Sequence, residues 1–206
     1  KVKLPVWQFG ENIVGKKEGG IVRADGFCSV WSVLVGMVFE GIMDPEQAMN
    51  EITDSQISSF DERTPIHAYI LWLLKEENCV ESRSGDGKLT LRNWRTPDNR
   101  DGIPWDPEFV KAINRSSKGV NTLHTSNLFR LLAQRFNISV EVGLYTNKVL
   151  TRVVYGEGNR ITVVSTGPHY NVWSRKVNPK KLGRVKEFYQ KYRYYAKSRR
   201  ISNKEN

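Results

Sequence analysis

The chain has 206 residues, 39% of them hydrophobic, which is enough for one sizeable core or for one domain with an appendage. No apolar run approaches the about 20 residues that a membrane-spanning helix needs, and we expect no signal peptide. Because the sequence begins with Lys1, we expect a piece of a larger protein. Its 2 cysteines are too few for a disulfide framework, so we expect a reducing, cytoplasmic compartment. We expect no cofactor and no metal, since the four-ligand spacing of a structural zinc site is absent.

The net charge of +10 is concentrated at the C-terminal end. Residues 175–206, called the basic tail below, carry 12 Lys and Arg and only 2 Glu, which gives 12 − 2 = +10. The remaining 174 residues are therefore neutral overall, and the basicity says little about them.

The first half of the chain predicts helices. Residues 1–24 contain several glycines and indicate an irregular N-terminal extension. An apolar helix is expected to start at Cys28 and to end near Gly41. Asp44 with Gln47 has the pattern of a capping box with proline at the first turn, and Thr64 with Pro65 predicts a further helix start.

The second half predicts mainly strands. Residues 81–108 are polar and rich in turn residues, which indicates a long loop or a small hairpin. A helix capped by Thr125 is followed by strand patterns over 138–145, 149–155 and 161–165. Residues 156–159 read as a hairpin turn, so we expect a meander. Helices first and strands last favour an α+β domain over residues 25–174.

Cys28 has the sequence context of a nucleophile. It follows the turn-forming pair Asp25 and Gly26 and opens an apolar helix. Unpaired backbone N–H groups and the positive end of the helix dipole favour a thiolate at such a position. A buried structural cysteine is the alternative.

His169 and Asn171 complete a possible catalytic set. They follow a turn and alternate along a strand, so both side chains face the same side. Asn171 can then orient the imidazole while His169 faces the thiol, as in other nucleophile–base–orienter sets. The other candidates are weaker. Cys79 follows acidic residues at a helix end, His67 is expected in packing or at the surface, and His124 is expected to support a turn.

These residues resemble a known family. An Asp-Gly-x-Cys segment that opens a helix, followed much later by His-aromatic-Asn, is similar to the OTU (ovarian tumour) cysteine deubiquitinases. The resemblance covers about residues 20–174 and includes the helix and strands that precede His169. It implies a papain-like fold with helices packed on a small, mostly antiparallel sheet. Val30 and Trp31 stand where the family usually has an aromatic and often a basic residue, which implies a divergent, viral or pathogen-derived member.

The resemblance assigns a role to each residue. Cys28 would be the nucleophile, His169 the general base and Asn171 the residue that holds the imidazole tautomer. Asp25 would shape the loop whose N–H groups receive the oxyanion. The substrate would be an isopeptide-linked ubiquitin or ubiquitin-like modifier, in the host cytosol if the protein is viral. Its diglycine tail needs a narrow channel. The candidate walls are Trp94, Trp105 and Trp173, although we favour core packing as the explanation for each.

Two other functions stay open. One is a papain-like protease that processes its own polyprotein, and the other is an inactive protease fold that binds nucleic acid or protein. The basic tail bears on the nucleic-acid alternative, because its pattern predicts an amphipathic basic helix. Its apolar residues recur at helical spacing among Lys and Arg: Leu182, Val185, Phe188, Tyr192 and Tyr195. Such a helix can contact RNA or an acidic membrane, or it can dock its apolar stripe on the domain and leave its basic face in solvent. We favour docking.

Overall fold

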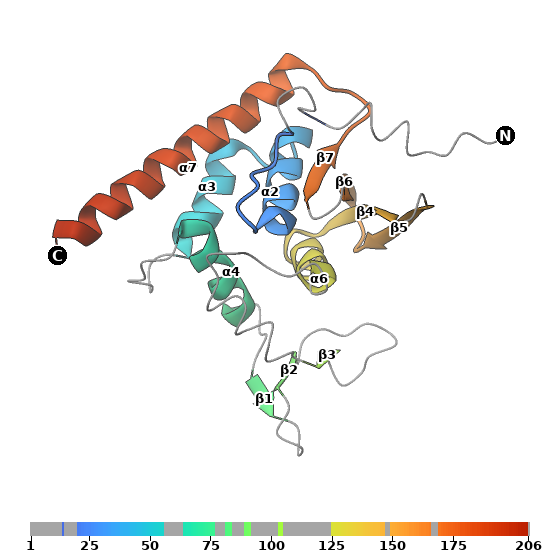
Figure 1. Cartoon of the computed structure of the whole chain (residues 1–206), viewed down its shortest axis with the longest axis horizontal. Helices are drawn as coiled ribbons and strands as arrows, with labels where there is room; N and C mark the ends of the chain where they lie inside the picture. The colour runs from blue at the N-terminus through green and yellow to red at the C-terminus, as the bar shows by residue number, and fades with distance from the viewer. Residues whose placement is uncertain are drawn as a thin grey trace.

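The computed structural model describes residues 14, 20–55, 64–76, 81–83, 89–91, 103–104, 125–146, 149–165 and 169–205. These residues form helices packed with a four-stranded mixed sheet, which confirms the predicted α+β class (Figure 1). The helices are α2 (Cys28–Glu40), α3 (Pro45–Asp54), α4 (Pro65–Glu76), α6 (Thr125–Phe136) and α7 (Pro179–Glu205). The sheet contains β4 (Ile138–Thr146), β5 (Val149–Tyr155), β6 (Asn159–Ser165) and β7 (Tyr170–Trp173).

Helix α2 lies at the centre of the molecule. Every residue from Cys28 to Phe39 is buried, because the helix is apolar on all sides and is surrounded by α3, α6, α7, β6 and β7. Gly36 allows the close contact with the sheet, since a Cβ there would lie 3.2 Å from Cδ1 of Ile161. The helix ends at Gly41, as predicted.

The other predicted helix starts are also found. The capping box of Asp44 and Gln47 is present in full, with Pro45 as the first residue of α3. Helix α4 begins at Pro65, and α6 begins at Thr125 itself. A carboxylate on α3 joins these helices, because Glu51 accepts hydrogen bonds from Tyr69 of α4 and from Arg135 of α6.

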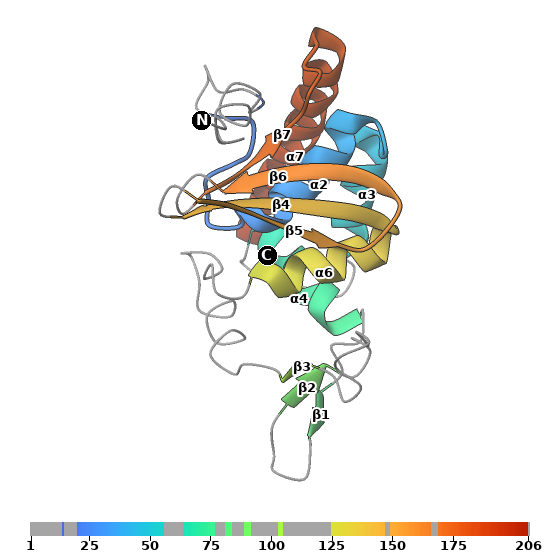
Figure 2. The same ribbon diagram turned by 90° about the vertical axis from the view of Figure 1, so that its right-hand side faces the viewer.

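The sheet differs from the predicted meander. Its strand order is β5-β4-β6-β7, with β4 antiparallel to β5 but parallel to β6. Residues 156–159 therefore do not close a hairpin between paired strands, and that prediction was wrong. Instead, the chain leaves β5, passes over the start of β4 and returns as β6 on the other side (Figure 2). The prediction of a mostly antiparallel sheet holds for two of its three strand pairs.

Glycines make this crossing possible. Gly156 has a φ of +73°, and a Cβ at this position would lie 2.4 Å from the carbonyl oxygen of Ile138. Gly158, with a φ of +108°, approaches the carbonyl oxygen of Asn137 in the same way. The glycines that suggested a hairpin turn are thus required by the close passage over β4.

Helix α7 docks along α2 and α3, as we expected for the basic tail (Figure 1). Val185, Phe188 and Tyr192 are at most 2% exposed and belong to the same core as α2. The tail is therefore part of the hydrophobic core, while the basic residues Lys186 and Lys197 on its other side are exposed.

A second, smaller sheet is formed by β1 (Glu81–Arg83), β2 (Leu89–Leu91) and β3 (Ile103–Pro104). We predicted a long loop or a small hairpin in this region, and the antiparallel pairing of β1 with β2 agrees with the second alternative. Within the described ranges, no helix combines the length and apolarity that a membrane crossing requires.

Candidate active site

The loop before α2 is held by the carboxylate of Asp25. Its Oδ1 accepts a hydrogen bond of 3.0 Å from the backbone N–H of Phe27, and its Oδ2 accepts one of 2.9 Å from the indole N–H of Trp31. Phe27 occupies the N-cap position of α2 but has no capping side chain. Asp25 thus holds the loop in position before the helix. It lies two residues before Phe27, the N-cap position at which a side chain usually caps a helix.

The thiol of Cys28 lies at the first position of α2, where the first-turn N–H groups have no partner within the helix. Burial raises the pKa of this thiol above its ordinary value of 9.0, and the nearby carboxylate of Asp25 raises it further. Hydrogen bonds from the backbone N–H groups of Tyr170, Cys28 and Ser29 lower the pKa, but burial outweighs them. The expectation of a favoured thiolate was therefore wrong for the resting protein, although the N–H groups act as predicted.

His169 comes directly before β7 and is half-buried. Burial lowers the pKa of its imidazole below the ordinary value of 6.5. Two groups oppose this shift, namely the backbone carbonyl of Val22, to which the ring donates a hydrogen bond, and the carboxylate of Asp25. Asp25 therefore acts electrostatically on both Cys28 and His169.

The strand brings the two candidate catalytic segments together. The N–H group that reaches the Cys28 sulfur from β7 belongs to Tyr170, the residue next to His169. The N–H of Tyr170 thus lies at the Cys28 sulfur, and the carboxylate of Asp25 is near enough to act on both Cys28 and His169.

Asn171 has a different set of contacts. Its side chain is buried, its Oδ1 accepts a hydrogen bond of 3.0 Å from the backbone N–H of Val172, and its amide nitrogen lies against Gly20. No hydrogen bond joins Asn171 to His169 within the part of the chain that the structure describes. Its role as the imidazole orienter stays a prediction.

The absence of a side chain at Gly20 leaves room for the side chain of Asn171. A Cβ at Gly20 would lie 2.0 Å from the Asn171 amide nitrogen, and the φ of +100° is one that side-chain-bearing residues rarely adopt. The glycine-containing segment before the cysteine therefore packs directly on the strand that carries Asn171.

Trp31 follows the candidate nucleophile by three residues and has a structural role. It is fully buried, and besides its bond to Asp25 its ring packs edge-on against Tyr192 of α7 with 4.7 Å between ring centroids. The guanidinium of Arg23 lies 5.5 Å from the same indole ring. Trp31 thus connects the loop before the cysteine to the docked tail.

Sequence reasoning missed a contribution of the tail to this loop. The hydroxyl of Tyr189 donates to the carbonyl of Ile21 at 2.7 Å and accepts from the N–H of Arg23 at 3.2 Å. The spacing of aromatic residues in the tail predicted a buried stripe, but it could not indicate that this stripe would reach the segment before Cys28.

The other candidates fall into two groups. His67 is 5% exposed and its ring centroid lies 5.2 Å from that of Phe27, so it supports packing as expected. Trp173 lines a pocket on the outer face of the sheet. The remaining candidates lie outside the described residues: Cys79, Trp94, Trp105 and His124.

No protein-family model matches the sequence, and comparisons with curated proteins and with solved structures give no significant match. The similarity to OTU proteases therefore stays a resemblance drawn from the sequence pattern of residues 20–174.

Proposed function

We propose that the chain is an OTU-type cysteine isopeptidase that removes ubiquitin or a ubiquitin-like modifier from proteins. One observation carries the proposal: the Cys28 thiol, at the start of a buried helix, accepts a hydrogen bond from the N–H next to His169. The two segments are 169 − 28 = 141 residues apart in sequence. A thiol, an imidazole on the adjoining segment and backbone N–H donors at a helix start are the parts that thiol-dependent acyl transfer needs.

The directions of the two pKa shifts favour a neutral resting pair. A thiol with a raised pKa and an imidazole with a lowered pKa are both uncharged near pH 7. His169 would then act as a general base, taking the thiol proton while the Cys28 sulfur attacks the isopeptide carbonyl carbon. The carboxylate of Asp25 stabilises the imidazolium that forms, since it raises the pKa of His169.

The remaining steps restore the enzyme. The C–N bond breaks, His169 returns the proton to the departing lysine amine, and a thioester remains on Cys28. His169 next takes a proton from a water molecule, whose oxygen attacks the thioester and releases the glycine carboxylate. The Cys28 sulfur leaves the carbonyl carbon as a thiol, because His169 gives it the proton taken from the water molecule. The N–H of Cys28, at the start of α2, would stabilise the oxyanion in both halves of the reaction.

Cleavage of ubiquitin conjugates tests this proposal. We expect Cys28→Ala to abolish cleavage without unfolding the chain and His169→Ala to reduce it almost as far. Asn171→Ala should slow catalysis less than His169→Ala. Undiminished cleavage by a folded Cys28→Ala variant contradicts the proposal. Cleavage of a peptide junction without a diglycine, in preference to ubiquitin, supports the polyprotein-processing alternative instead.

A further inference from the structure

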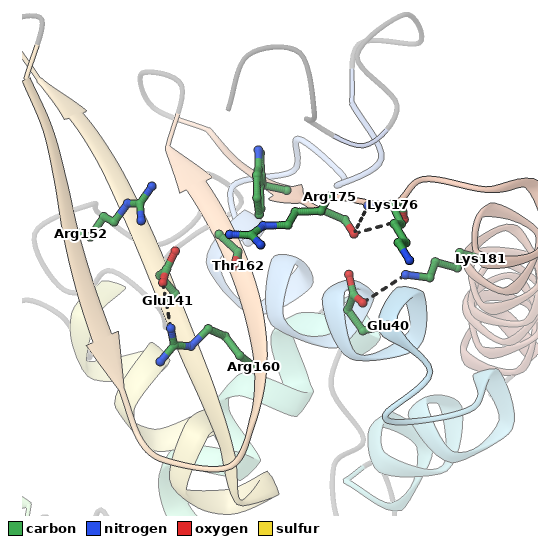
Figure 3. A pocket seen from close by; sticks show the side chains of 10 residues that line it. Glu40, Glu141, Arg152, Arg160, Thr162, Arg175, Lys176 and Lys181 are labelled. Atoms are coloured by element: carbon green, nitrogen blue, oxygen red, sulfur yellow. Dashed lines mark hydrogen bonds and ion pairs between the residues drawn. The ribbon is translucent and has the colours of Figure 1, made fainter. Parts of the chain in front are cut away.

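The outer face of the sheet carries a large basic pocket, far along β7 from His169. The pocket has a volume of about 880 Å³ (Figure 3). Ten residues line it: Glu40, Glu141, Arg152, Arg160, Thr162, Trp173, Ser174, Arg175, Lys176 and Lys181. Five of them are basic and two are acidic, so the lining has a net charge of 5 − 2 = +3.

The acidic residues of the pocket already have partners. Glu141 forms an ion pair of 3.2 Å with Arg160, and Glu40 forms one of 3.3 Å with Lys181. For Arg175 and Lys176, by contrast, no ion pair is found among the residues that the structure describes, and both are exposed. Their positive charges remain available to a ligand.

The arrangement of the cations matches a chain of phosphates better than a single anion. Arg152 and Arg160 come from the strands, whereas Lys176 and Lys181 come from the opposite side, beyond β7 (Figure 3). Arg175 extends between them toward Thr162. A guanidinium group can bind two oxygens of one phosphate at once. Several cations along a groove can bind successive phosphates of a nucleic-acid backbone.

Trp173 adds a surface for bases. It is half-buried and lines the same pocket, among residues that are otherwise all polar or charged. Stacking of bases on aromatic side chains beside a basic groove is the usual way in which proteins hold single strands without reading their sequence. A small apolar ligand does not fit such a polar lining, and a flat bilayer surface does not reach a recessed indole.

We propose that this pocket binds single-stranded nucleic acid, with phosphates on Arg175, Lys176 and the neighbouring cations and a base on Trp173. This site is distinct from the proposed protease site, because Asp25, Cys28 and His169 are not among its ten lining residues. The basic tail supplies Arg175, Lys176 and Lys181, but Arg152, Arg160 and Trp173 belong to the sheet, so the site requires more than the tail.

Two charge-matched double variants test the proposal. The first is Arg175→Glu with Lys176→Glu, in the pocket. The control is Arg193→Glu with Lys197→Glu, on the exposed side of α7. Both remove one Arg and one Lys from exposed positions, so they change the net charge equally. Binding of a fluorescent oligouridine of about 10 nucleotides is measured by anisotropy at several salt concentrations.

We expect the full chain and the control to bind and the pocket variant to lose at least tenfold in affinity. Removal of two phosphate contacts should also make the slope of log K against log salt concentration less steep by about 1.4, since each contact with a single strand contributes about 0.7. Trp173→Ala should weaken the single strand but not a duplex of the same length. Equal losses in both double variants overturn the proposal. So does a wild-type chain that binds vesicles of phosphatidylcholine and phosphatidylserine but not the oligouridine.

Discussion

The carboxylate of Asp25 accepts the indole N–H of Trp31 at 2.9 Å, six residues further along the chain. The same carboxylate accepts the N–H of Phe27 and acts electrostatically on Cys28 and His169. One side chain therefore fixes the loop, satisfies a buried indole and sets the charge environment of the candidate nucleophile and base.

Removal of this carboxylate should destabilise the fold. Asp25→Ala leaves the N–H of the fully buried Trp31 without its acceptor, which costs about 1–3 kcal/mol. Urea denaturation measures the loss. Glu157→Ala, at an exposed position, is the control and should change the free energy of unfolding by less than about 0.5 kcal/mol. Equal stability of the two variants contradicts the structural role of Asp25.

The pKa shifts predict how the reactivity of Cys28 depends on pH. Because its pKa is raised above 9.0, alkylation by iodoacetamide should still increase beyond pH 9.0. Mass spectrometry of the peptide that contains Cys28 separates it from Cys79. Asp25→Asn removes a charge that raises this pKa and should shift the profile to lower pH. A rate that is already constant between pH 6 and 8 would indicate a resting thiolate, contrary to the neutral pair.

The neutral Cys28 and His169 pair also predicts that the rate of cleavage falls at acidic pH. His169 must be unprotonated to accept the thiol proton, and its pKa is lowered below 6.5. We therefore expect kcat/KM to fall with decreasing pH, with a midpoint below 6.5. A midpoint well above 6.5 is the contrary result.

The crossing over β4 can be tested at its glycines. Gly156→Ala forces a positive φ on alanine and brings its Cβ to 2.4 Å from the Ile138 carbonyl, so we expect a loss of at least 2 kcal/mol, on the order of a strained backbone position. Gly183→Ala in α7 is the matched control, because its Cβ meets nothing within 4 Å. Thermal denaturation should show the control to be as stable as the parent chain or up to about 1 kcal/mol more stable. An unchanged stability of Gly156→Ala would contradict the close contact between Gly156 and the Ile138 carbonyl.

Docking of the basic tail predicts a strong dependence on one aromatic residue. Phe188 is fully buried and packs against Trp31, with ring centroids 5.9 Å apart. Phe188→Ala should cost about 3–5 kcal/mol, whereas Tyr194→Ala, at a residue that is 77% exposed, should cost less than about 0.5 kcal/mol. Similar stabilities of the two variants would mean that the tail does not contribute to the core.

The local signals in the sequence predicted the elements well. Helix starts at Asp44 and Pro65 and the helix end at Gly41 follow from chemistry within a few residues, and the structure has all of them. The strand order did not follow from such signals. A Gly-Glu-Gly-Asn segment fits a hairpin or a crossing equally well, and only the packing of β4 between β5 and β6 decides between them.

The energetics of the candidate site could not be predicted from local sequence. The sequence places Cys28 at a helix start, yet the pKa of the thiol depends on burial by segments far away in the chain. The contacts of Asn171 with Gly20 and of Tyr189 with Ile21 likewise join positions that no local pattern connects.

Covalent capture by a ubiquitin probe with a thiol-reactive C-terminal electrophile tests the central claim most directly. The proposal predicts a stable adduct on Cys28, identified by mass spectrometry, and none with Cys28→Ala. The Arg175→Glu, Lys176→Glu variant should form the adduct at the parent rate, because its substitutions lie in the separate basic pocket. Absence of an adduct on a folded parent chain, or an adduct on a residue other than Cys28, would contradict the account.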